Sequence, residues 1–249
     1  MGSLTITHKE LIVAGLVTVI YLFTGFTPNP FAWPGQISNR IALTETIQPD
    51  NPQIEEFNAK FEDYYANEFV PLSSFPSDPI ELEIYAVGRF TIQEIEYGED
   101  ITNYLSWDYR PSLSEVLNRG SDDCDGRAIV ACSLLTFRGY DSYVVIGKWH
   151  AWVEVHLEEG RTITILDEGL QDISPWYTKY NTEKIDFQWL TFLDLVLHNF
   201  LLILLFEKII IIIYSFLNQN RDFYSIYAVL IALGLSPIPI LILFSLMRP

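Results

Sequence analysis

Apolar residues divide the chain into three zones: long uncharged apolar runs near both ends, and a middle in which apolar and polar positions alternate. The main runs cover residues 11–26, 189–206 and 223–247. An apolar stretch approaching twenty residues predicts a helix that crosses a bilayer. We therefore expect about three transmembrane helices, with a soluble domain between the first two.

The first apolar run is expected to be a transmembrane anchor over residues 1–28. A signal peptide would show a similar run, but no clear small-x-small cleavage site follows it, which favours an uncleaved anchor. Lys9 precedes the run, and positive residues beside a span favour the cytoplasmic side. This predicts a multi-pass membrane protein whose soluble domain lies on the extracytoplasmic side.

Residues 189–249 are expected to hold two transmembrane helices. A Glu–Lys pair at 207–208 interrupts the first of them. Either one long tilted helix runs from 189 to 217, or the span ends near Phe206. Asp194 and His198 lie four residues apart on one face, close to the helix start, where polar side chains can reach the interface.

Helical periodicity begins in the soluble middle after a segment rich in Pro, Asn and Thr. Residues 27–50 are expected to form a stalk or an irregular surface segment, so that 29–79 would hold a stalk and an accessory helix. Ser112 followed by Glu115 is a capping box. Apolar spacing and capping signals predict helices that start after Asp50, at Ile80 and at Ser112. Residues 80–188 are expected to be the main domain.

A helix followed by three β-rich runs makes up the later part of this domain. The segment SDDCDGRA turns helical at Cys124, and Gly139 is expected to cap the helix end. The runs SYVVIG, HAWVEVHL and RTITILD predict strands, the last two joined by a turn at 158–160. The order predicts an α+β fold, in which a helix that carries a cysteine at its N-terminus packs on an antiparallel sheet.

Candidate catalytic side chains fall at the ends of these elements. Cys124 lies at a helix N-terminus, where free N–H groups and the helix dipole favour a thiolate and can hold an oxyanion. His150 shares a strand face with Trp152, Glu154 and His156, whereas the alternate positions are apolar, so the histidine face can line a cleft. Asp167 ends the next strand. A thiol, an imidazole and a carboxylate can together perform acyl transfer.

The formal charge of −17 lies in the middle of the chain, where residues 29–188 hold 28 acidic and 11 basic side chains. Such an acidic domain argues against nucleic acid as a partner, because a phosphate backbone requires a basic face. It also argues against docking on anionic headgroups. The expected partners are a peptide or protein amide substrate, the lipid bilayer around the apolar runs, and other membrane proteins.

Cys124 and Cys132 would lie about 12 Å apart on one helix, too far for a disulfide. Asp122, Asp123 and Asp125 surround the first cysteine. They are good N-cap residues, and they oppose ionisation of the thiol. A calcium loop is not indicated, because the DxDxDG spacing is absent. We expect neither a metal nor another cofactor.

At these residues the chain resembles the transglutaminase-like superfamily, in its microbial and archaeal cysteine-protease-like members. Those members show a Gly-Asp-Cys helix start, a His-Ala-Trp-Val-Glu strand and a strand ending in Asp. Here the matching segments are DDCDGRA at 122–128, HAWVEV at 150–155 and ILDEG at 165–169. The resemblance covers about 80–170 and implies a papain/transglutaminase-like core. It implies Cys124 as nucleophile, His150 as general base and acid, and Asp167 as the residue that orients the imidazole.

The chain also departs from the family pattern. Asp122 and Glu168 stand where a glycine and a proline are common. Asp125 follows the cysteine directly, where protein-crosslinking members have Trp, and this favours hydrolysis. Trp107 lies near the place of an upstream aromatic that helps hold the oxyanion, and Glu154 is a substitute for the orienting carboxylate.

These patterns predict a membrane-anchored cysteine acyl-transfer enzyme, a peptidase or amidase that works through a thioester. One alternative is a catalytically silent interaction module, or a subunit of a membrane complex. Another has Cys124, His150 and Asp167 as zinc ligands with an open coordination position.

Overall fold

The computed structural model describes residues 6–69, 78–148, 150–167 and 175–219. Its α-helices are α1 (His8–Thr24), α2 (Trp33–Ile41), α3 (Pro52–Tyr64), α5 (Pro79–Glu94), α6 (Asp100–Asn103), α7 (Leu113–Arg119), α8 (Cys124–Phe137) and α9 (Trp189–Gln219). Its strands are β1 (Glu96–Tyr97), β2 (Ser121–Asp122), β3 (Asp141–Gly147), β4 (Ala151–His156), β5 (Thr162–Ile165), β6 (Trp176–Tyr180) and β7 (Ile185–Phe187). Short 3₁₀ segments cover Pro30–Ala32, Leu43–Thr46 and Glu158–Gly160, and a π-helical turn covers Tyr65–Phe69.

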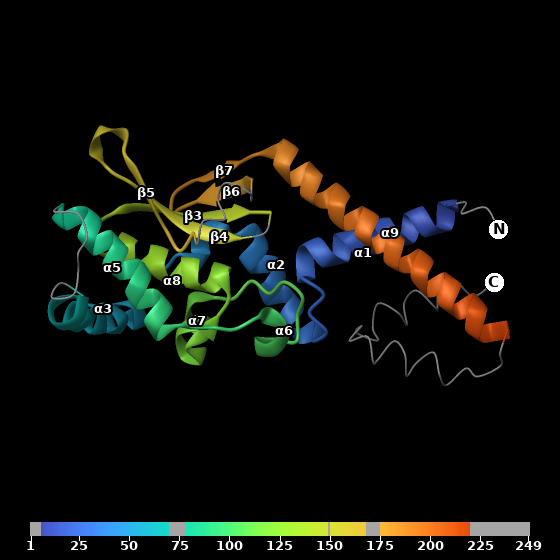
Figure 1. Cartoon of the computed structure of the whole chain (residues 1–249), viewed down its shortest axis with the longest axis horizontal. Coiled ribbons are helices and arrows are strands. Elements are labelled where there is room, and N and C mark those ends of the chain that lie inside the picture. Colours follow the sequence, from blue (N-terminus) through green and yellow to red (C-terminus); the bar gives the residue numbers. More distant parts are fainter. Residues whose placement is uncertain (1–5, 70–77, 149, 168–174, 220–249) are drawn as a thin grey trace.

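An antiparallel five-stranded sheet forms one layer of the domain, in the order β5-β4-β3-β6-β7. Helix α8 packs on β3 and β4, and α3, α5 and α7 pack around α8 (Figure 1). Fully buried apolar side chains from the helices and the sheet form the core between the two layers, including Val130, Leu134, Val144 and Val153. The expected α+β architecture, with the cysteine-bearing helix on an antiparallel sheet, is therefore confirmed.

The helices expected in the middle of the chain form for the reasons that their sequences indicate. The Asn51 side chain caps α3, which begins with Pro52 and turns Ile54 and Phe61 into the core. Ser112 and Glu115 form the reciprocal capping box of α7. Gly139 follows the end of α8 with a φ of +90°, a region that glycine enters without strain.

Residues 27–50 are not the irregular stalk that their composition predicts. They contain α2, and the Gln36 side chain on this helix is 1% exposed. Its amide donates to the Arg110 carbonyl and accepts from the Arg110 N–H, at 3.0 and 2.9 Å. Helix α2 is thus tied to the main domain by polar contacts, which a search for apolar periodicity does not detect.

Two apolar helices, α1 and α9, extend from the domain and pack against each other (Figure 1). Among the described residues, the helix segment long and apolar enough to cross a membrane is Trp189–Ile211, with a mean hydropathy of 2.0. Helix α1 has 17 residues, about 26 Å of helix, and falls short of the thickness of a hydrocarbon core. The described residues therefore contain one candidate span, not the two that the expectation of about three spans places there. The run at 223–247 lies outside the described residues.

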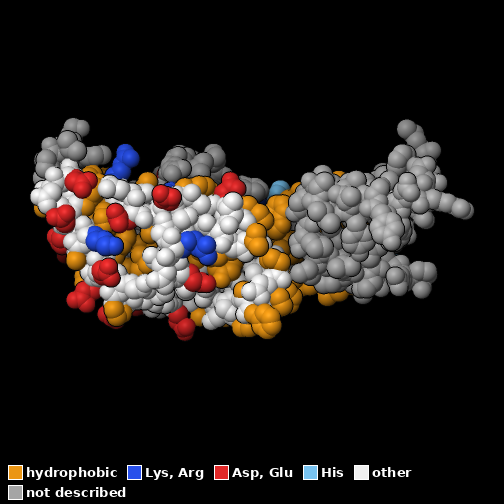
Figure 2. Space-filling model, turned by 90° about the horizontal axis from the view of Figure 1, so that it is seen from below, with side chains coloured by type: hydrophobic (Ala, Val, Ile, Leu, Met, Phe, Trp, Pro, Cys, Tyr) orange, Lys and Arg blue, Asp and Glu red, His pale blue; other side chains and the backbone are white. Residues whose placement is uncertain are grey.

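The two alternatives for the first C-terminal run are resolved by α9, which continues through the Glu–Lys pair to Gln219 as one helix. Asp194 on its first turns pairs with Lys148 at 2.6 Å, so this ionisable side chain meets the soluble domain. Acidic side chains are spread over the opposite end of the molecule, which the α+β domain forms (Figure 2). The molecule thus has an acidic domain end and an apolar helical end.

Candidate functional site

Cys124 is the first residue of α8, and the structure fixes the backbone that leads into it. Strand β2 pairs in parallel with β1, which places Asp122 opposite Tyr97. The Asp123 carboxylate then caps α8 by accepting from the Asp125 N–H at 3.1 Å. At this first helical position the N–H of Cys124 has no intrahelical partner. The half-buried thiol thus lies at an N-terminus with open donors, as expected.

His150 closes the tight hairpin between β3 and β4. Its carbonyl accepts from the Gly147 N–H at 2.8 Å, and Ile146 and Ala151 form the adjacent residue pair between β3 and β4. Lys148 in the same turn is held by α9 through Asp194. The histidine backbone is therefore fixed from both sides, by the sheet and by the long helix.

The thiol and the histidine are linked through the backbone next to His150. The N–H of Ala151, in the peptide group that joins His150 to Ala151, acts on the Cys124 thiol and lowers its pKa. The imidazole Nε2 lies 2.8 Å from the Leu166 carbonyl oxygen. A carbonyl only accepts, so Nε2 carries the proton, and Nδ1 of the neutral ring is the free basic nitrogen. This tautomer is the one that a general base requires.

Leu166 has a φ of +62°, a left-handed conformation that is uncommon for residues other than glycine. The turn at this residue directs its carbonyl to His150 and precedes Asp167 directly. Asp167 is half-buried. The hydrogen bond that orients the imidazole thus comes from the backbone one residue before the expected carboxylate, and the role of Asp167 stays a prediction.

The two auxiliary candidates lie elsewhere. The Glu154 carboxylate binds Lys179 Nζ at 2.5 Å and lies 3.7 Å from His156, so it does not substitute as the partner of His150. Trp107 is 59% exposed, and its backbone N–H donates to the Gly25 carbonyl at the end of α1. Among the described residues, no hydrogen bond or ring contact joins Trp107 to Cys124.

The electrostatic surroundings of Cys124 oppose its ionisation. Burial raises the pKa of the thiol well above its ordinary value, and the carboxylates of Asp123 and Asp125 raise it further. The Ala151 N–H and the Arg110 guanidinium act in the opposite direction but do not offset this. A nucleophilic Cys124 therefore needs His150 as the acceptor of its proton, since the helix N-terminus alone does not hold the thiolate.

Arg110 is the cation nearest to this acidic segment in the ion pairs of the described residues. It lies 3.0 Å from Asp125 and 4.0 Å from Asp108, with only 12% of its side chain exposed. Asp108 is also held by Arg40 at 3.0 Å. The two guanidinium groups keep the pKa of Asp108 below its ordinary value, although burial acts to raise it.

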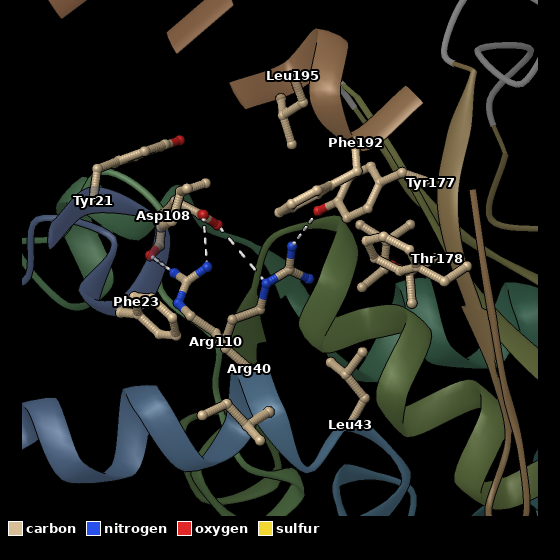
Figure 3. A pocket seen from close by; sticks show the side chains of 14 residues that line it. Tyr21, Phe23, Arg40, Leu43, Asp108, Arg110, Tyr177, Thr178, Phe192 and Leu195 are labelled. Atoms are coloured by element: carbon tan, nitrogen blue, oxygen red, sulfur yellow. Dashed lines mark hydrogen bonds and ion pairs between the residues drawn. The ribbon is translucent and has the colours of Figure 1, made fainter. Parts of the chain in front are cut away.

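A pocket of about 240 Å³ opens on the other side of Arg110, where α1 and α9 join the domain (Figure 3). Its wall is mainly apolar, with Phe192 and Leu195 from α9, and Arg40 and Arg110 form a polar side. Ile146 also lines it, and this residue pairs with Ala151 beside the thiol. The pocket therefore adjoins the backbone of the candidate site at the border with the apolar helices.

Reasoning from sequence missed the residues that support this site through the backbone. The Ala151 N–H and the Leu166 carbonyl carry no side-chain signature. Arg110 is a side chain, but it lies in a loop, 14 positions before Cys124. Its position just before the Pro-Ser capping segment gives no sign of the partner that it binds.

Comparison of the chain with protein-family models and with curated proteins gives no match.

Proposed function

We propose that this chain is a membrane-anchored cysteine acyl-transfer enzyme of the transglutaminase-like kind, acting as a peptidase or amidase. One observation carries the proposal. The Ala151 N–H, next to His150, lowers the pKa of the Cys124 thiol, while the Nε2 proton of His150 is held by the Leu166 carbonyl. We propose that the unprotonated Nδ1 of His150 faces the thiol and serves as its base.

In the proposed reaction Nδ1 of His150 takes the thiol proton, and the sulfur of Cys124 forms a bond to the substrate carbonyl carbon. The C–N bond then breaks, and His150 returns the proton to the leaving amine. Water attacks the thioester with His150 again as base, the C–S bond breaks, and a carboxylic acid leaves. The N–H groups at the start of α8 stabilise the oxyanion, and Asp167 stabilises the imidazolium.

The Cys124–His150 site would act on substrates at the membrane surface. The pocket beside Arg110 lies where α1 and α9 leave the domain, so we propose that it holds an apolar group of the substrate. We further propose that the protein crosses the membrane more than once, with the domain on the extracytoplasmic side, because long apolar runs lie near both ends of the sequence and Lys9 precedes the first.

Alkylation of the full-length protein in detergent tests the nucleophile. Cys132 provides the internal control, because its thiol is 0% exposed and lies 3.4 Å from the Ser142 hydroxyl. We expect iodoacetamide to label Cys124 and not Cys132 in the folded protein. His150→Gln should slow labelling of Cys124, because the base that accepts its proton is removed.

Hydrolysis of amide substrates is then measured with a peptide library presented in mixed micelles. We expect turnover in the wild type and in Cys132→Ala, none in Cys124→Ala, and a loss of about 10²–10⁴-fold in His150→Gln. Turnover that survives in Cys124→Ala would refute the assignment of the nucleophile. An unreactive Cys124 in the wild type, together with no turnover, would refute the enzyme.

The raised pKa of the Cys124 thiol favours a second candidate, a silent interaction module within a membrane complex. That module would keep the fold and lose the chemistry. Crosslinking in native membranes distinguishes the two. A stable protein partner captured equally by the wild type and by Cys124→Ala, without turnover, would support the module.

A further inference from the structure

Three carboxyl groups, two of them buried and one half-buried, converge beside the start of α8. Asp100 comes from α6, Asp122 from β2 and Asp123 from the N-cap of α8, and one oxygen of each lies within 4.8 Å of the others. Asp100 and Asp122 are 6% and 0% exposed. Cys124, His150 and Asp167, the ligands of the alternative zinc site, do not form such a group among the described residues.

Two carboxylate oxygens beside the start of α8 have no hydrogen-bond donor in the part of the chain that the structure describes. Asp100 accepts from the Tyr109 N–H through Oδ2, but its Oδ1 is buried without a hydrogen-bond partner among the described residues. Asp125 is also 6% exposed; its Oδ2 binds Arg110, and its Oδ1 has no donor. The Asp125 carboxyl lies within hydrogen-bond reach of Asp123, so it faces the cluster from outside the trio. Buried polar atoms are normally satisfied, and those without partners indicate an absent ion or water.

The charges nearby do not balance. The four carboxylates of Asp100, Asp122, Asp123 and Asp125 face two guanidinium groups, those of Arg110 and Arg119. Asp108 is matched separately by Arg40. When all four carboxyl groups are ionised, two negative charges remain, and one divalent cation would neutralise them.

The backbone is shaped to admit the converging carboxyl groups. A Cβ on Gly126 would lie 2.5 Å from Cγ of Asp122. Position 126, in the first turn of α8, must therefore be glycine for the Asp122 carboxyl to lie where it does. The Asp122 carboxylate is further held by the Tyr104 hydroxyl at 2.5 Å and by the Asp123 N–H at 2.8 Å. Each of these oxygens keeps a lone pair for a further ligand.

We propose that Asp100, Asp122 and Asp123 bind one calcium ion, with Asp125 as a neighbouring carboxylate. The donor set contains only oxygen, which hard cations prefer, and three or four carboxylates suit Ca²⁺ rather than Mg²⁺, which retains most of its water. Bound calcium would join α6, β2 and α8, and would hold the turn that leads to Cys124. Calcium binding at this site does not require the proposed catalysis.

Calorimetric titration of chelator-treated, full-length protein with Ca²⁺, in detergent and physiological salt, tests the site. We expect one specific site and a rise in melting temperature of roughly 5–10 °C when Ca²⁺ is about 100-fold above its dissociation constant. Asp100→Asn should abolish both effects. Asp123→Asn should do so as well, and it should fold, because Asn is an equally good N-cap.

Two controls separate this site from other effects. Asp50→Asn removes an exposed carboxylate of the same kind and should bind Ca²⁺ like the wild type, which excludes diffuse attraction to the acidic surface. Cys124→Ser should also bind like the wild type, so failure of the catalytic proposal leaves this result unchanged. The proposal is overturned if the wild type shows no single site, or if both ligand variants keep it. A third outcome would also overturn it: Asp100→Asn stabilises the chelator-treated protein, and Ca²⁺ does not change the melting temperature of the wild type. In that case the carboxyl groups share protons and do not bind a cation.

Discussion

Replacing Arg110 by methionine removes the buried cation that joins the candidate site to the pocket. In the wild type its guanidinium lies 3.0 Å from Asp125, with 12% and 9% of the two side chains exposed. Loss of one partner of a buried ion pair costs about 3–5 kcal/mol, because the other charge stays buried without compensation. For a chain of this length we expect the melting temperature to fall by roughly 6–20 °C.

The assay is thermal unfolding of the full-length protein in detergent, followed by far-UV circular dichroism. Lys60→Met is the matched control, because Lys60 and Glu56 form an exposed pair at 3.9 Å on α3. We expect this control to cost less than about 0.5 kcal/mol.

A double-mutant cycle identifies the source of the loss. Asp125→Asn in the Arg110→Met background removes the uncompensated charge, while Asp108 keeps Arg40 at 3.0 Å. The double variant should therefore recover at least half of the lost stability, with a coupling of roughly 1–3 kcal/mol. If Arg110→Met lowers the melting temperature no more than Lys60→Met, the ion pair is not a buried structural contact and the reasoning is refuted.

Three further predictions concern glycine positions and charges. Gly126→Ala should cost about 1–3 kcal/mol because its Cβ would overlap the Asp122 carboxyl, whereas Gly35→Ala, with open space inside α2, should stabilise by about 0.5–1 kcal/mol in the same melting assay. The pKa of Asp108 is lowered in the folded state, so its stabilising contribution is complete above about pH 4 and is lost as pH falls through the folded-state pKa. The stability difference between the wild type and Asp108→Asn should therefore shrink in acid, and a difference that is constant with pH would contradict this. Asp194→Asn breaks a pair in which the aspartate side chain is 62% exposed, and it should change stability by at most about 1 kcal/mol in the same assay.

Local patterns were sufficient for the elements that carry Cys124 and His150. The apolar residues of α8 and the alternation in β4 are dictated by burial against each other, so period and composition reveal them. The capping residues of α7 act within one turn and are equally readable. These features depend on neighbours in the chain, which is why the sequence is informative about them.

Other parts depend on contacts between distant segments. Helix α2 is held by hydrogen bonds between the Gln36 side-chain amide and the Arg110 backbone, 74 positions away. Strand β7 is exposed along its length, so it lacks the alternation of a half-buried strand. Glu154 shares the predicted strand face with His150, yet its carboxylate forms an ion pair with Lys179 from β6. Periodicity cannot indicate which partner a polar side chain will meet.

The sequence by itself determined that an acidic α+β domain is joined to apolar helices, and that a cysteine begins a helix on an antiparallel sheet. It determined these because hydrophobic period, capping and charge act over a few residues. Only the tertiary structure decided that the Leu166 carbonyl holds the imidazole, that the Ala151 N–H meets the thiol, and that Asp100 joins the aspartates before Cys124. Those contacts use backbone groups and a distant carboxylate, and they exist only once the chain has packed.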